Sequence, residues 1–150
     1  MKTTPEKLTE VTKSVVALIP GMTAQCSKGV ATVFNHLFGK TDLQNKSANN
    51  IVYYLRDSPE WEQITGTLQE KLTKVQNLAN EGWFVVAGKT ESGSGHVAVI
   101  VPGTLTPSYG WKADVPAAFD TGINKRWSGK PLSNSWRASD SGGVEFFRYK

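Results

Sequence analysis

Two apolar runs joined by a polar, glycine-rich loop constrain the fold of this chain more than any other feature of its sequence. Residues 83–87 and 96–101 are rich in β-branched and aromatic side chains, whereas residues 88–95 between them are polar and rich in glycine. Runs of this composition around such a loop are typical of an antiparallel hairpin. The chain is therefore expected to contain an antiparallel β-sheet.

Helical periodicity dominates the part of the chain before this hairpin. Apolar residues recur at helical spacing over residues 4–19, 26–38 and 48–55, and each segment has one apolar side. Residues 20–21, a proline followed by a glycine, are expected to end the first helix. Gly39 is expected to end the second, because glycine readily adopts the left-handed conformation of a helix C-terminus. Three helices are therefore predicted.

A fourth helix is predicted from a start signal that contains proline. Ser58, Pro59 and Glu60 have the form of an N-cap, a first-turn proline and an acidic first turn. Residues 80–82 then end the helical pattern. The apolar residues expected on the inner side of this helix are Trp61, Ile64, Leu68, Leu72, Val75 and Leu78.

The order of the elements indicates the fold class. Further strands are predicted over residues 115–119 and 144–149. Helices first and strands afterwards are typical of an α+β protein, with the N-terminal helices packed on an antiparallel sheet. A chain of 150 residues without an internal repeat or linker has the usual size of one domain. Residues 1–150 are therefore predicted to form a single domain.

A single cysteine and a mild positive charge exclude several classes of protein. Because Cys26 is alone, neither an intramolecular disulfide nor a multi-cysteine zinc site can form. The net charge of +4 comes from scattered basic residues. It fits a mixed solvated surface or attraction to an anionic polymer such as bacterial cell wall, but no nucleic-acid-binding motif is present. Neither a membrane-spanning run nor a signal peptide is recognised, so no membrane insertion is expected.

Cys26 and His96 are the residues expected to carry chemistry. Cys26 opens the predicted second helix, where unpaired N–H groups and the helix dipole favour a reactive thiolate. Such a nucleophile needs a base nearby, usually histidine. His36 lies about 15 Å further along the same helix, whereas His96 opens a strand after a flexible loop and shares a strand face with Ala98, whose small side chain would let a helix pack close. The alternative, that Cys26 fills the core and His96 only begins a strand, stays open on spacing alone.

Two segments around these residues resemble a known family. Residues 25–30 (QCSKGV) are similar to the Asn-Cys-Ser-Gly-Phe-Val motif of the first family of type VI secretion amidase effectors, which are NlpC/P60-like peptidoglycan amidases. Residues 81–105 (EGWFVVAGKTESGSGHVAVIVPGTL) resemble that family's strand, loop and Gly-His-Val-Ala-Val series. Asn49 and Asn50 resemble its spacer. The resemblance covers roughly residues 20–105.

The resemblance implies a papain-like NlpC/P60-type fold and a cysteine peptidase that needs neither a metal nor an organic cofactor. Cys26 would be the nucleophile and His96 the general base. The substrate would be the peptide stem of peptidoglycan, cut between γ-D-glutamate and meso-diaminopimelate. The protein would be an antibacterial toxin, carried without a signal peptide by the secretion machinery into the periplasm of a target cell. The producer would be protected by a periplasmic immunity protein.

The sequence departs from the family pattern at several places. Gln25 replaces asparagine, Lys28 and Gly29 replace Gly-Phe, and the single cysteine cannot form the disulfide that some members carry. The match is poor after residue 105, so the group that would orient His96 is open. Asp114 is preferred over Asp120 for this role because of its distance from His96, and a backbone carbonyl near residue 115 is a third candidate.

Two alternative functions stay open at this point. A phage or housekeeping peptidoglycan hydrolase could share the fold, and a non-enzymatic binding module could carry an inert Cys26. In an enzyme, residues 88–95 with Trp83 and Trp111 are expected to line the substrate groove.

Overall fold

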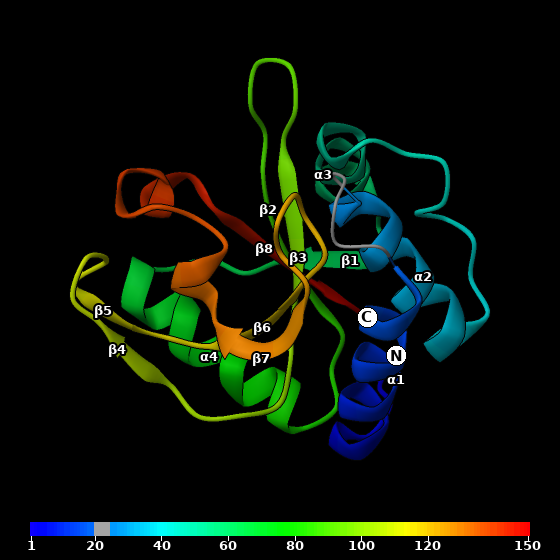
Figure 1. The fold of residues 1–150 in the computed structure, drawn as a ribbon, viewed down its shortest axis with the longest axis horizontal. Helices are drawn as coiled ribbons and strands as arrows, with labels where there is room; N and C mark the ends of the chain where they lie inside the picture. Colours follow the sequence, from blue (N-terminus) through cyan, green and yellow to red (C-terminus); the bar gives the residue numbers. More distant parts are fainter. Residues whose placement is uncertain (20–24) are drawn as a thin grey trace.

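An antiparallel sheet forms the centre of the protein, as a computed structural model that describes residues 1–19 and 25–150 shows (Figure 1). The sheet has six strands in the order β1-β8-β2-β3-β6-β7, and a separate pair joins β4 to β5. The predicted α+β class and the predicted hairpin of β2 with β3 are therefore confirmed. The strands are β1 (Trp61–Gln63), β2 (Val85–Lys89), β3 (His96–Ile100), β4 (Thr106–Ser108), β5 (Ala113–Val115), β6 (Ala117–Asp120), β7 (Trp127–Pro131) and β8 (Glu145–Tyr149).

The first three predicted helices are confirmed. They are α1 (Pro5–Leu18), α2 (Cys26–Phe38) and α3 (Ala48–Asp57). Thr4 and Ser47 cap α1 and α3 with their hydroxyl oxygens, and Gly39 ends α2 in the left-handed conformation at φ 67°. The predicted stop at residues 20–21 lies outside the described residues. Two short 3-10 helices, η1 (Leu132–Asn134) and η2 (Ala138–Gly143), lie between β7 and β8.

The predicted start of the fourth helix is wrong. Residues 61–63 form strand β1, in which Trp61 is opposite Tyr149 of β8, and the helix is α4 (Leu68–Asn80). Thr67 and Glu70 form a capping box there, so local side chains satisfy the first N–H groups of α4. The start signal at residues 58–60 and apolar spacing together placed Trp61 on the helix, because one apolar residue fits either element until its strand partner is known.

The predicted strand at residues 115–119 is two strands. Val115 ends β5, where it is opposite Thr106 of β4, whereas Ala117 begins β6 opposite Pro131 of β7. Pro116 lies between them and lacks the N–H group that would continue a ladder. The chain therefore changes partners at this proline.

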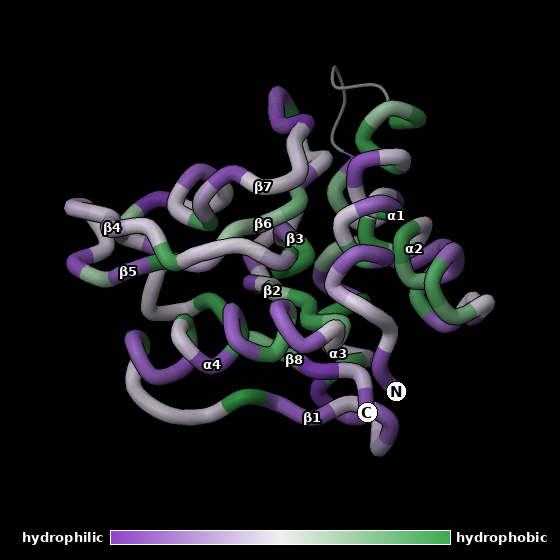
Figure 2. Tube along the Cα trace, turned by 90° about the horizontal axis from the view of Figure 1, so that it is seen from below, coloured by the Kyte–Doolittle hydropathy of each residue, from purple (hydrophilic) through white to green (hydrophobic). Residues whose placement is uncertain are grey.

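Two apolar cores lie on the two faces of the sheet, because alternate strand residues point in opposite directions. Figures 1 and 2 show α1, α2 and α3 towards one side and α4 with the β4–β5 pair towards the other. In the first core, Phe34 of α2 is fully buried and lies 4.9 Å from Tyr149 and 5.4 Å from Phe84 between ring centroids. These aromatic contacts hold α2 against the sheet. The central strands β2 and β3 contribute Val86, Val97 and Val99 to the first core and Val85, Ala87, Ala98 and Ile100 to the second.

Candidate active site

Three elements bring a cysteine, a histidine and an aspartate together. Cys26 is the first residue of α2 and is buried, with 8% of its surface exposed. His96 is the first residue of β3, and Asp120 is the last residue of β6. β3 and β6 are antiparallel, with Val99 opposite Phe119. The start of β3 and the end of β6 therefore lie side by side, at the same end of the two strands.

Asp120 is held in contact with His96. Its Oδ2 lies 2.6 Å from His96 Nε2, and its side chain is fully buried. The other carboxylate oxygen, Oδ1, accepts a hydrogen bond of 2.8 Å from the backbone N–H of Gly122. Both oxygens therefore have partners, which fixes the orientation of the carboxylate and, through it, the imidazole ring.

The preference for Asp114 as the residue that orients His96 is wrong. Asp114 lies on β5 opposite Pro107, and its backbone N–H donates to Gln69 Oε1 at 2.8 Å. Distance along the chain favoured Asp114, but Pro116 moves the chain from the β4–β5 pair into the main sheet before Asp120. Val115, the source of the carbonyl alternative, is likewise opposite Thr106 in the β4–β5 pair.

The surroundings of His96 favour its protonated form. Burial lowers the pKa of His96, but the hydrogen bond to Asp120, then the hydrogen bond to Cys26 and the two charges outweigh burial and raise the pKa to about 9. Cys26 therefore lies close enough to the imidazole to raise its pKa. At neutral pH the ring is an imidazolium between an aspartate and the Cys26 sulfur. This arrangement is suited to a nucleophilic cysteine.

This raised pKa predicts a pH-dependent contribution to stability. Since the folded-state pKa of His96 is about 9 and the ordinary value is 6.5, the contribution is complete below pH 6.5 and is lost as pH rises through about 9. We expect the difference in free energy of unfolding between wild type and His96→Ala to shrink over that range by up to about 3 kcal/mol. Urea denaturation at pH 6, 7.5 and 9.5 measures it, and a difference that grows with pH would contradict the assignment.

A glycine, rather than Ala98, lets α2 approach the site. Ala98 lies in the second core, on the α4 side of the sheet, so its small side chain does not affect how closely α2 packs. Gly29, one turn after Cys26, faces the end of β6, where an added Cβ would lie 2.0 Å from Thr121 Oγ1. Gly122 has the same function beside His96, because a Cβ there would lie 2.6 Å from the ring atom Cε1. Both close approaches therefore require glycine.

The aromatic residue at the site is Trp136, which sequence reasoning missed. Its ring lies edge-on to His96 at 5.0 Å between centroids. Trp111, expected in the groove, is buried instead and donates its indole N–H to the Trp136 carbonyl at 3.1 Å. Trp83 lies just before the start of β2, beside Lys2 and Arg148, whereas His96 is opposite Lys89 at the end of β2. Trp83 therefore does not line the site.

The hairpin loop beside His96 is held by α3. Asn49 donates from Nδ2 to the Glu91 carbonyl at 2.8 Å and accepts from the Glu91 N–H at 3.1 Å. Gly95 allows this contact, because a Cβ there would lie 2.2 Å from Asn49 Oδ1. The hairpin projects beyond the rest of the sheet in Figure 1. Asn49 therefore orders the loop that leads directly into His96.

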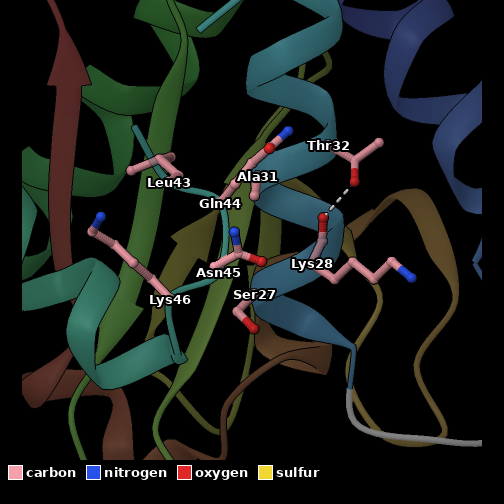
Figure 3. Close-up of a pocket in the computed structure, with 8 residues that line it drawn as sticks. All are labelled: Ser27, Lys28, Ala31, Thr32, Leu43, Gln44, Asn45 and Lys46. Carbon is pink, nitrogen blue, oxygen red and sulfur yellow. Dashed lines mark hydrogen bonds between the residues drawn. The ribbon is translucent and has the colours of Figure 1, made fainter. Parts of the chain in front are cut away.

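A pocket of roughly 450 Å³ lies on another side of α2 (Figure 3). Ser27 and Ala31 line it, and these residues point about 100° and 140° around the helix axis from Cys26. Figure 3 shows Lys28 and Lys46 extending to opposite sides of it. The pocket is lined by Ser27, Lys28, Ala31, Thr32, Leu43, Gln44, Asn45 and Lys46, and thus by neither Cys26 nor His96.

Neither the second histidine nor any cluster of acidic residues offers a metal site within the described ranges. His36 is exposed on α2, as expected for a histidine without a role at the site. Outside residues 20–24, no group of three His, Cys, Asp or Glu side chains could hold a metal ion. Within the same ranges, every helix is too short or too polar to cross a bilayer.

A comparison with models of known protein families finds no match to this chain, and a comparison with curated proteins finds none either.

Proposed function

We propose that this protein is a cysteine amidase that hydrolyses a bond in the peptide stem of peptidoglycan. The observation that carries the proposal is that His96 contacts a buried aspartate, Asp120, and lies close enough to Cys26, at a helix start, for the cysteine to raise its pKa. A core-filling cysteine needs neither an imidazolium nor a carboxylate behind it. A nucleophilic cysteine requires the first and benefits from the second.

The arrangement also supports a papain-like fold of the NlpC/P60 type. The helix that carries Cys26 packs on an antiparallel sheet, His96 begins a strand of that sheet, and Asp120 ends the neighbouring strand. Cysteine precedes histidine along the chain, as the resemblance of residues 25–30 and 81–105 implies. The orienting group is Asp120 in this proposal.

The proposed reaction has two steps. The Cys26 thiolate attacks the carbonyl carbon of the scissile amide, and the first N–H groups of α2, which lack partners within the helix, stabilise the oxyanion. The His96 imidazolium gives its proton to the leaving amine as the carbon–nitrogen bond breaks. Neutral His96 then takes a proton from water, which attacks the thioester, releases the carboxylic acid product and regenerates the thiolate.

The substrate and setting follow from the resemblance and from charge. The net charge of +4 favours association with an anionic cell wall. The bond proposed is that between γ-D-glutamate and meso-diaminopimelate. We place the protein among antibacterial effectors that a secretion machine delivers into the periplasm of a rival cell, and we expect a periplasmic immunity protein that covers Cys26.

Digestion of purified diaminopimelate-type peptidoglycan tests this function. Wild-type protein should release stem-peptide fragments, and mass spectrometry of the fragments identifies the bond. The control is the same protein treated briefly with iodoacetamide, which reacts fastest with thiols, and Cys26 is the one cysteine of the chain. An intact wall after treatment with wild type, or equal digestion by the alkylated protein, would refute the proposal.

A further inference from the structure

We infer that Thr121 is a positioning residue that sets the distance between Cys26 and His96. Thr121 has no part in the chemistry described above, but it lies directly after Asp120 and is 1% exposed. Its hydroxyl donates to the carbonyl oxygen of Gln25 at 3.0 Å, and its own carbonyl oxygen accepts from the Gln25 N–H at 3.2 Å. Two hydrogen bonds therefore join the end of β6 to the residue before the nucleophile.

These two hydrogen bonds lie in a segment that also contacts His96. Asp120, Thr121 and Gly122 are consecutive, and they contact His96, Gln25 and the His96 ring respectively. One short segment thus contacts both the start of α2 and the imidazole. A shift of the Thr121 side chain would therefore move Cys26 relative to His96.

Thr121 also packs closely against α2 itself. Gly29 lies against Thr121 with no room for a Cβ, since the added atom would lie 2.0 Å from Thr121 Oγ1 and 3.1 Å from Phe119 Cζ. Gly29 also donates its N–H to the Gln25 carbonyl at 2.9 Å, so this oxygen accepts both from the helix and from Thr121. The Thr121 hydroxyl therefore acts on the first turn of α2, where Cys26 lies.

The inference rests on the proposed function but can be tested without substrate. Alkylation of Cys26 by iodoacetamide proceeds through the thiolate, so its rate reports on the surroundings of the sulfur. Misplacement by about 1 Å can cost about 10²-fold in rate. The test variant is Thr121→Val, which keeps the shape of the side chain and removes the hydroxyl, and Thr121→Ser is the variant expected to rescue.

The matched control is Thr12→Val. Thr12 is also fully buried, and its hydroxyl donates to the Leu8 carbonyl at 2.8 Å and accepts from Ser128 Oγ at 2.8 Å, on α1. This substitution therefore removes a buried threonine hydroxyl of the same kind that does not contact the nucleophile helix. Any general effect of losing a buried hydroxyl should appear equally in both variants.

We expect Thr121→Val to lower the alkylation rate at pH 7 about tenfold or more. Thr121→Ser and Thr12→Val should stay within about twofold of the wild-type alkylation rate. On substrate, kcat should fall and KM should stay nearly constant. Equal alkylation rates at pH 7 for Thr121→Val and Thr12→Val, with folding confirmed by circular dichroism, would overturn the inference.

The outcomes separate this inference from the proposed function. If peptidoglycan is not a substrate but Thr121→Val alone slows alkylation, the positioning role stands and the proposed substrate is wrong. If the wild type digests the wall and Thr121→Val digests it equally well, the proposed function stands and the positioning role is wrong.

Discussion

Cys26→Ala is expected to reduce peptidoglycan hydrolysis to background, a fall of about 10⁴-fold or more in kcat. The reason is that the sulfur forms the covalent intermediate, and neither His96 nor the N–H groups of α2 can replace it. The fold should survive, because alanine keeps the Cβ and favours the helix that Cys26 begins. The measurements are release of stem peptides by mass spectrometry and the melting temperature.

Ser27→Ala is the matched control for Cys26→Ala. Ser27 is the next residue of α2, and its side chain lines the pocket of Figure 3 rather than the candidate active site. Loss of its hydroxyl should therefore change kcat by less than about threefold. Cys26→Ala that keeps substantial activity with a normal melting temperature would show that Cys26 is not the nucleophile. Unfolding of Cys26→Ala would instead assign it a structural role.

Asp120→Asn is expected to lower kcat about 10²- to 10⁴-fold. Asp120 accepts at both oxygens, from His96 and from the Gly122 N–H. An asparagine has only one acceptor oxygen, so its amide group must face one of these two donors. It also removes the negative charge that raises the pKa of His96, so the alkaline limit of activity should move from near pH 9 to lower pH. The measurement is kcat/KM between pH 5 and pH 10.

Asp114→Asn is the control for this prediction, because it makes the same substitution at the aspartate that chain distance favoured. Its backbone N–H bond to Gln69 would remain, and its activity and pH profile should match wild type within about twofold. Equal losses in both variants would remove the orienting role from Asp120. An unchanged alkaline limit in Asp120→Asn would contradict the proposed cause of the raised pKa of His96.

The sequence was sufficient to predict where Cys26 and His96 lie in the fold, because local signals mark both positions. The apolar stripe of α2 ends at Cys26, and the hairpin loop ends at His96, so both residues were placed at the ends of elements. The structure brings these two residues together, and their catalytic roles remain a proposal. The third group could not be predicted, because no local signal shows that Asp114 lies in the β4–β5 pair and Asp120 in the main sheet.

The other contacts around Cys26 and His96 could not be predicted from the sequence either. Trp136, Thr121 and Gly122 lie far along the chain from Cys26, and no periodicity marks them. Gly29 was visible only as a departure from a motif, yet its missing Cβ is what allows α2 to lie against Thr121. Such contacts depend on the path of the chain between elements rather than on any local pattern.

The first three helices, the hairpin and the α+β class were determined by the sequence itself, because caps, glycines and apolar periodicity act within a few residues. Tertiary structure decided that Trp61 joins β8 rather than a helix, that the chain changes sheets at Pro116, and that Asp120 contacts His96. The physical reason is that strand pairing and burial of a carboxylate are long-range interactions, whose partners are chosen only when the whole sheet has assembled.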